Sequence, residues 1–161
     1  METGALTKLE RGIYLLEGFW EDEFMVCSLR YRKGIFSYNT ALYLHGLVDA
    51  FPERLTMTFP QGHNSASLSS PLLEVRRSSA SLFGLGASEV KTPSDNLVRA
   101  YNKERTLCDI LRGSEADDTD RSRIAFRRYC ASFDKDIPRL LEYASSLRVT
   151  ARVHNYLKAL L

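Results

Sequence analysis

The pattern of apolar residues changes once along this chain of 161 residues, close to Asn102. Before that point, short apolar runs alternate with polar residues and are separated by Gly, Pro and Ser, a pattern typical of strands and turns. After it, apolar residues recur at intervals of three and four, which predicts amphipathic helices. Because strands come first and helices follow, we predict an α+β fold: a small mixed or antiparallel sheet followed by a C-terminal cluster of four amphipathic helices.

Each of the four predicted helices has one apolar face, and Asn102 is the expected N-cap of the first. The apolar positions are Leu107, Ile110 and Leu111, then Phe126, Tyr129, Cys130 and Phe133, then Ile137, Leu140, Leu141 and Ala144, and finally Val149, Val153, Tyr156, Leu157 and Leu160.

Residues 35–60 predict a capped helix, a turn and a strand in close succession. Ser37 is the expected N-cap of the helix, because its hydroxyl can accept an amide hydrogen bond of the first turn. Gly46 is expected to end this helix. Leu55, Met57 and Phe59 then alternate with threonines, which predicts a half-buried strand. We also predict a helix over 22–30 and strands over 72–76, 89–92 and 97–101.

Residues 5–19 predict a short hairpin or wing with a basic tip, and this segment contains the basic side chains Lys8 and Arg11. Residues 1–24 carry two basic and six acidic side chains, a net charge of −4, whereas residues 119–161 carry nine and four, a net charge of +5. This asymmetry predicts an acidic or nucleic-acid partner for the C-terminal part, and solvated helix faces are the alternative. The candidate contacts are Arg121, Arg123, Arg128 and Arg152.

A serine, a histidine and acids occur in the two most distinctive parts of the sequence, at Ser37, His45, Glu104, Arg105 and Asp109. These residue types invite a hydrolase interpretation. The Gly-x-Ser-x-Gly turn of many serine hydrolases is missing, and Ser37 and His45 occupy positions where a helix cap and a helix C-terminus are expected. We therefore predict a structural polar motif. Arg105 lies against the helix dipole and is expected to pair with Asp109, four residues on, although a pocket for a partner or a phosphate is the alternative.

Composition excludes several other classes. The three cysteines are widely spaced, without a Cys-x-x-Cys pair, so we expect buried thiols and no zinc site. No dinucleotide or phosphate-binding glycine motif occurs, so we expect no cofactor or metal. No apolar run approaches the roughly 20 residues that span a bilayer, and the first residues lack the apolar middle of a signal peptide, so we expect a cytoplasmic protein without a membrane partner.

Four sequence blocks occur in the same order and at similar spacing as in a known family. They are Gly12-Ile13-Tyr14, SYNTALYLHGL over 37–47, Thr58-Phe59-Pro60 and ERTLCD over 104–109. Together they make the chain resemble the AbiEi family of antitoxins from abortive-infection toxin–antitoxin systems, whose pattern contains GIY, SxxTALYLHGL, TxP and ERTxxD.

The resemblance implies two activities: neutralising a nucleotidyltransferase-like toxin, and repressing the operon through an N-terminal winged helix-turn-helix that binds DNA. Only eleven residues precede Gly12, so we expect residues 1–19 to hold the remnant wing of that domain and residues 20–161 to form the antitoxin domain. On this interpretation the chain is not an enzyme. The alternatives are a nucleic-acid-binding module or a small nuclease or phosphoesterase.

Overall fold

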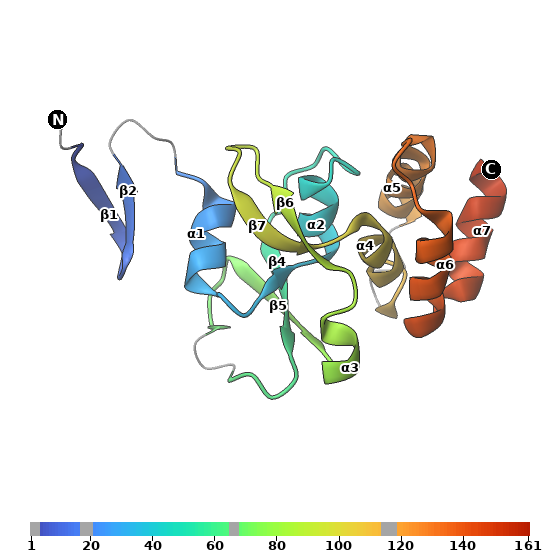
Figure 1. The fold of residues 1–161 in the computed structure, drawn as a ribbon, viewed down its shortest axis with the longest axis horizontal. Coiled ribbons are helices and arrows are strands. Elements are labelled where there is room, and N and C mark those ends of the chain that lie inside the picture. Colours follow the sequence, from blue (N-terminus) through green and yellow to red (C-terminus); the bar gives the residue numbers. More distant parts are fainter. Residues whose placement is uncertain (1–3, 17–20, 65–67, 114–118) are drawn as a thin grey trace.

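The computed structural model describes residues 4–16, 21–64, 68–113 and 119–161, and within these ranges the chain has a mixed α+β architecture. The described residues form seven helices, one sheet of two strands and one sheet of five. Figure 1 shows how these elements are arranged. The strands lie mainly in the first half of the chain and the longer helices follow them. The predicted fold class is therefore confirmed.

The two-stranded sheet is an N-terminal hairpin of β1 (Leu6–Glu10) and β2 (Ile13–Leu16). Gly12 adopts a left-handed φ of 81° in the turn. Leu6 lies opposite Leu16 and Lys8 lies opposite Tyr14, so these four side chains share one exposed face. The predicted hairpin is confirmed within the described ranges, and residues 17–19 lie outside them.

Helix α1 (Glu23–Arg30) follows and lies between the hairpin and the large sheet (Figure 1). Asp22 caps it by accepting hydrogen bonds from the amides of Phe24 and Met25. The same carboxylate accepts a hydrogen bond from the side-chain amide of Asn96, at 2.8 Å, in the turn between β6 (Ala87–Lys91) and β7 (Leu97–Tyr101). One acidic side chain therefore both begins the helix and attaches it to the sheet.

The five-stranded sheet has the order β5-β4-β3-β7-β6. Its strands are β3 (Ile35–Phe36), β4 (Leu55–Pro60), β5 (Leu73–Ser78), β6 (Ala87–Lys91) and β7 (Leu97–Tyr101). The pairs β3–β4 and β6–β7 are antiparallel, whereas β3–β7 and β4–β5 are parallel, so the sheet is mixed.

Strand β4 differs from its prediction as a half-buried strand. Thr56 and Thr58 are buried like Met57 and Phe59 between them, because both faces of this inner strand are covered. One face meets the apolar cluster under α1, which includes Phe24, and the other meets α2 (Tyr38–Leu44).

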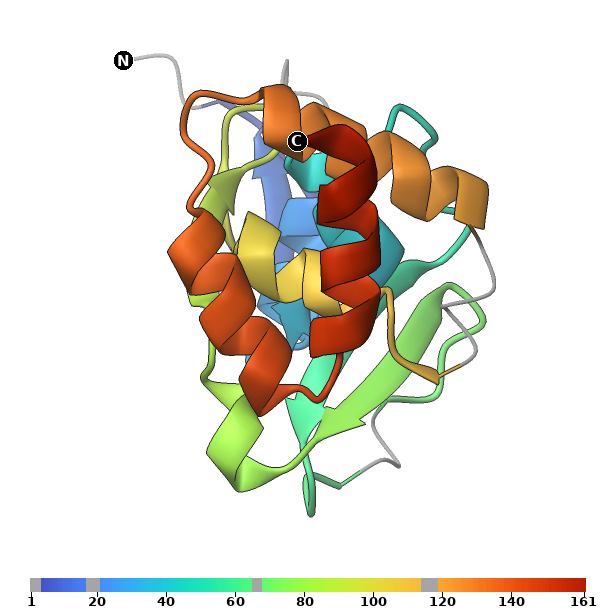
Figure 2. The same ribbon diagram turned by 90° about the vertical axis from the view of Figure 1, so that its right-hand side faces the viewer.

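The C-terminal cluster consists of the four predicted helices, α4 (Lys103–Asp109), α5 (Thr119–Ala131), α6 (Ile137–Ser146) and α7 (Thr150–Leu160). Figure 2 shows α4 behind α6 and α7, on the side of the sheet opposite α1. Short helix α3 (Ala80–Phe83) precedes β6. No helix formed by the described residues is long and apolar enough to cross a membrane.

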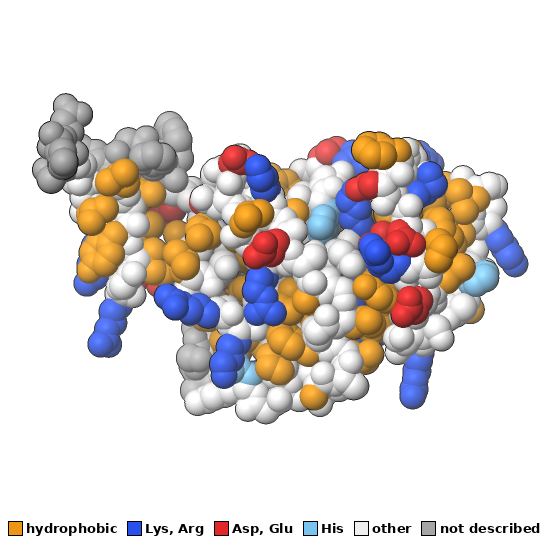
Figure 3. Space-filling view, in the orientation of Figure 1, with side chains coloured by type: hydrophobic (Ala, Val, Ile, Leu, Met, Phe, Trp, Pro, Cys, Tyr) orange, Lys and Arg blue, Asp and Glu red, His pale blue; other side chains and the backbone are white. Residues whose placement is uncertain are grey.

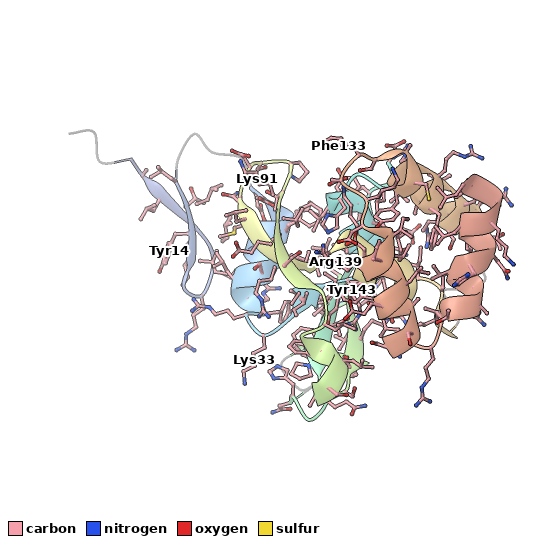
Figure 4. The ribbon with its side chains drawn as sticks, turned by 45° about the vertical axis from the view of Figure 1, so that its right-hand side comes forward. Tyr14, Lys33, Lys91, Phe133, Arg139 and Tyr143 are labelled. Atoms are coloured by element: carbon pink, nitrogen blue, oxygen red, sulfur yellow. The ribbon has the colours of Figure 1, made fainter. Side chains whose placement is uncertain are left out.

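Phe133 was predicted to face the core as the last member of the stripe in α5, and this prediction is wrong. The helix ends at Ala131, and Asp136 begins α6 by accepting a hydrogen bond from the amide of Arg139. Phe133 falls in the connection between the two helices and is 99% exposed (Figure 4). Where the helix ends, rather than the spacing of apolar residues, decides the position of this side chain.

Candidate functional site: the polar motif around helix α4

The five residues of the predicted polar motif lie on two helices in the middle of the molecule. Ser37 and His45 flank α2, while Glu104, Arg105 and Asp109 belong to α4. The two helices contact each other, and α4 also packs against α6 and α5. Asn102 begins α4 as predicted, since its side chain accepts a hydrogen bond from the amide of Arg105 at 2.9 Å.

Arg105 is the largest side chain that is almost fully buried, and its guanidinium is bound on several sides. Nε donates to Asp109 Oδ2 at 3.0 Å, so the predicted pair of these residues is confirmed. Nη1 donates to the carbonyls of Leu82 and Leu85 at 2.6 and 2.8 Å. The guanidinium also lies 4.1 Å from the centre of the Tyr101 ring. Arg105 thereby ties α4 to the segment around α3.

Asp109 is the acidic partner of this pair and is equally buried. Loss of solvent raises the pKa of its carboxyl group, and the nearby guanidinium groups of Arg105 and Arg112 oppose that rise. Arg112 lies nearer the protein surface, with a side chain that is 38% exposed, and its Nη1 atom is 3.5 Å from the second carboxylate oxygen, Asp109 Oδ1. The carboxylate is therefore held between one buried and one partly exposed arginine.

Space around Arg105 is limited by a glycine that the sequence did not indicate as part of the motif. Gly86 has a left-handed φ of 76°, and a Cβ atom there would lie 2.6 Å from Arg105 Cβ. No other residue fits without moving the backbone of α4 or of the chain before β6. This close approach allows the carbonyl of Leu85 to reach the guanidinium.

Ser37 occupies the N-cap position of α2, but its hydroxyl does not cap the helix, so that prediction is wrong. Instead, Thr58 Oγ1 donates to Ser37 Oγ at 2.8 Å, and both side chains are buried. Thr40 acts in the same way, because its hydroxyl accepts a hydrogen bond from the amide of Thr56 at 2.8 Å. The Ser-x-x-Thr part of the motif thus attaches α2 to β4.

The backbone at the start of α2 has an unusual conformation next to Ser37, the residue that binds β4 instead of capping the helix. Tyr38, directly after Ser37, has a φ of 51°, which is uncommon for a side chain of this size. Its ring lies under the guanidinium of Arg76, at 4.6 Å from the ring centre. The start of the helix is therefore irregular, and Ser37 points to β4 rather than to the first turn.

His45 was predicted at a helix C-terminus, and this position is confirmed. It lies at the C-cap of α2, but its Nε2 atom is 2.7 Å from the carbonyl oxygen of Tyr101 at the end of β7. Burial lowers the pKa of His45, which favours the neutral ring with Nε2 as the donor. The imidazole therefore joins α2 to the last strand of the sheet.

Glu104 connects α4 to the helices beyond it. Tyr129 Oη donates to Glu104 Oε1 at 2.8 Å and accepts a hydrogen bond from the amide of Asp136, also at 2.8 Å. Tyr129 is fully buried, and loss of solvent raises the pKa of its hydroxyl group. From the sequence, Tyr129 was predicted only as part of an apolar stripe. Its hydroxyl group is the one feature that could have indicated the hydrogen bonds, because a phenylalanine would fill the same apolar space without it.

The candidate partner contacts on the C-terminal helices all have partners within the chain. Arg128 forms two hydrogen bonds with Asp49, at 2.6 and 2.9 Å, and Arg121 donates to Asn39 at 2.8 Å. Arg123 lies 3.3 Å from Asp120, and Arg152 donates to the carbonyl of Leu111. Asp49 supplies an acidic counterpart from the loop after α2. Arg128 therefore already has an acidic partner within the chain.

The hairpin residues Lys8 and Arg11 are exposed and lie at the opposite end of the molecule from α5 and α7 (Figure 1). The structure thus does not bring the two sets of basic candidates together.

Of the three thiols, Cys108 is buried, whereas Cys27 and Cys130 are partly buried. Burial raises the pKa of the Cys27 and Cys108 thiols to about 12, so neither is an activated nucleophile.

In chemical terms, this site is a set of buried hydrogen bonds that join helices to a sheet. Each of the five motif side chains is bound to another group of the same chain. Among the described residues, no cluster of three or more His, Cys, Asp or Glu side chains is placed to hold a metal ion.

A comparison of the sequence with protein-family models gave no match, and a comparison with curated proteins gave none either.

Proposed function

We propose that this chain is the toxin-binding part of an antitoxin similar to the AbiEi family, and that it neutralises a nucleotidyltransferase-like toxin without catalysis. Two features support the proposal. The sequence carries four blocks of the family pattern in order. Most polar side chains within two of those blocks are buried, and the five motif residues are hydrogen-bonded to other groups of the chain, which favours a binding domain over a reactive site.

One observation carries the non-enzymatic part of the proposal: His45 donates Nε2–H to a backbone carbonyl 56 residues away, and Ser37 accepts from Thr58. A catalytic serine needs a hydrogen-bonded base and an approach for substrate. Here the serine and the histidine bind different strands, β4 and the end of β7. Asp109, the acid that would complete such a set, is occupied by Arg105.

The same contacts argue against the rival enzyme class, a nuclease or phosphoesterase built on Glu104, Arg105 and Asp109. The guanidinium that would bind a phosphate is bound by a carboxylate and two carbonyls. Glu104 is bound by a tyrosine. A phosphate would have to displace several buried hydrogen bonds at once, and the free energy lost in breaking them exceeds what a new contact with the phosphate would contribute.

In the full-length family, repression of the operon uses an N-terminal winged helix and DNA. For this chain we propose no specific recognition of the operator, because Lys8 and Arg11 of the hairpin would contact only phosphates, which carry no sequence information. A gel shift on the operon's own promoter checks this. The expected result is no specific binding by this chain in the presence of excess competitor DNA, and specific binding would contradict it.

Complex formation tests the proposal itself. The chain and the product of the neighbouring gene, which this proposal expects to be a nucleotidyltransferase-like toxin, should be mixed as purified proteins and analysed by size-exclusion chromatography and calorimetry. A stoichiometric complex is expected. The variant Arg105→Ala removes a buried contact and no surface contact, so it shows whether binding depends on the stability of the fold. If the purified, folded chain neither binds this toxin nor restrains its activity, the antitoxin proposal is wrong.

A further inference from the structure

A groove lies toward the N-terminal end of the molecule, away from the polar motif. It has a volume of about 380 Å³ and is bounded by α1, by the hairpin and by the segment from Phe51 to Leu55. Leu72, just before β5, also lines it. Hydrophobic side chains gather over the hairpin and α1 in the view of Figure 3, which shows one side of this end of the molecule.

The floor of the groove is apolar, and part of it is open to solvent. Val26 and Cys27 line it from α1, and Leu55 and Leu73 line it from the sheet. Phe51 and Leu72 are 50% and 72% exposed. Large apolar side chains that surround one concave site are more informative than the same residues scattered over a surface, because together they mark a place where another apolar group can be buried.

The rim of the groove is acidic. Glu10, Glu21, Glu23 and Glu53 line it, and Arg30 is the single basic side chain among its lining residues. Arg30 is itself bound to Glu10 by a salt bridge, so it does not balance the other three carboxylates. The rim therefore carries a net charge of −3. This local excess agrees with the negative charge of residues 1–24.

We propose that this groove binds a basic amphipathic segment of a partner protein, with an apolar side chain in the groove and Lys or Arg side chains against the glutamates. The apolar floor supplies the affinity and the carboxylates supply the orientation and the rate of association. The inference goes beyond the proposed function, because it does not depend on whether the partner is a toxin. It also assigns the partner contact to the acidic end, whereas the sequence pointed to the basic C-terminal helices.

The chemistry of the groove disfavours other occupants. Phosphates of nucleic acid or of an anionic membrane would meet a negative rim and would be repelled. Thiol chemistry at Cys27 is disfavoured, since the sulfur lies 3.7 Å from the sulfur of Met57 and burial raises the thiol pKa to about 12. A protein segment that combines Lys or Arg with apolar residues matches both the charge and the floor.

The test uses the whole chain and two synthetic probes. One is a pentapeptide in which leucine and lysine alternate, with lysine at both ends, and the other carries glutamate in place of lysine. NMR titration of the backbone amides measures binding. The lysine peptide should shift the resonances of Val26, Leu55 and Leu72, and its affinity should fall as salt is raised. The glutamate peptide should not bind at these positions.

Two substitutions at the groove and two matched controls locate the site. Leu72→Ser and Glu53→Lys change exposed side chains and should leave the fold intact, while together they weaken binding of the lysine peptide about tenfold or more. Leu97→Ser and Glu142→Lys make the same changes at exposed positions on β7 and α6, and should leave the affinity unchanged.

Three outcomes would overturn the proposal. The first is equal binding of the two peptides, and the second is equal binding by the groove variants and the control variants. The third is self-association of the chain in sedimentation that Leu72→Ser and Glu53→Lys abolish, because the occupant would then be a second copy of this chain. These outcomes are separate from the toxin experiment, so the groove can fail while the antitoxin proposal stands, and the reverse.

Discussion

Arg105 donates from Nε to Asp109 Oδ2 at 3.0 Å, and both side chains are only 2% exposed. Arg105→Ala would leave the Asp109 carboxylate buried, with only Arg112 near it at 3.5 Å, and would remove the donors for the carbonyls of Leu82 and Leu85. We expect the free energy of unfolding to fall by about 3–5 kcal/mol, the usual cost of breaking a buried ion pair.

Denaturant melts measure this loss, and Arg139→Ala is the matched control. Arg139 pairs with Asp136 at 3.2 Å, but its side chain is 50% exposed, so water replaces the lost contact. The control should change the midpoint far less. An Arg105→Ala midpoint equal to that of the wild type would show that the guanidinium does not hold α4 in place.

Tyr129→Phe removes one hydroxyl that serves two elements. Glu104 then loses its donor, and the amide of Asp136 loses its acceptor at the start of α6. A buried hydrogen bond to a charged group contributes about 1.5–3 kcal/mol, so we expect a loss of that size. Tyr156→Phe, in which the ring still stacks on Phe126, should have a small effect. Similar melting curves for the two variants would contradict the assigned role of Tyr129.

The hydroxyl pair of Ser37 and Thr58 predicts coupling between a helix start and a strand. Ser37→Ala leaves a buried hydroxyl on Thr58 without its acceptor, and Thr58→Val does the reverse. Each variant should cost about 1 kcal/mol, and the double variant should cost clearly less than the sum of the two. A double-mutant cycle in urea measures this difference. Strict additivity would show that the contact contributes nothing to stability.

His45 predicts a dependence of stability on pH. Burial lowers its pKa in the folded state below the ordinary value of about 6.5, which the unfolded chain keeps. The unfolded chain therefore binds more protons in the interval between these two values, so stability rises with pH there. The contribution of His45 is fully present above about pH 6.5 and is lost as the pH falls through the folded-state pKa.

Unfolding experiments between about pH 7 and pH 5 measure this slope. His45→Gln can keep a donor toward the carbonyl of Tyr101 but does not titrate, so the slope should become smaller. His154→Gln, at an exposed position on α7, should leave the slope unchanged. An unchanged slope in His45→Gln would mean that the imidazole is not held neutral by the fold.

Much of the architecture could be predicted from the sequence because periodicity and capping are local. The spacing of apolar residues predicted α4 to α7, and Asn102 was predicted as a cap and is one. The pair of Arg105 and Asp109 was also predictable, since one helical turn places the two side chains on the same face.

The partners from other elements could not be predicted in this way. Ser37 binds Thr58 and His45 binds the carbonyl of Tyr101, and both contacts depend on how α2 packs on the sheet. A serine before a helix is a cap by local rules, but a buried strand beside it offers a better partner than the first turn. Phe133 shows the same limit, because the end of α5 took it out of the apolar stripe.

The most direct test of the proposed antitoxin function is the growth of cells that express the product of the neighbouring gene, which the proposal expects to be a nucleotidyltransferase-like toxin, together with this chain. If the chain is a non-catalytic antitoxin, growth is restored by the wild type and equally by His45→Gln, as long as the variant is folded and present at the same level. Growth that stays inhibited with the wild-type chain, or that only the folded wild type and not His45→Gln restores, would contradict the account.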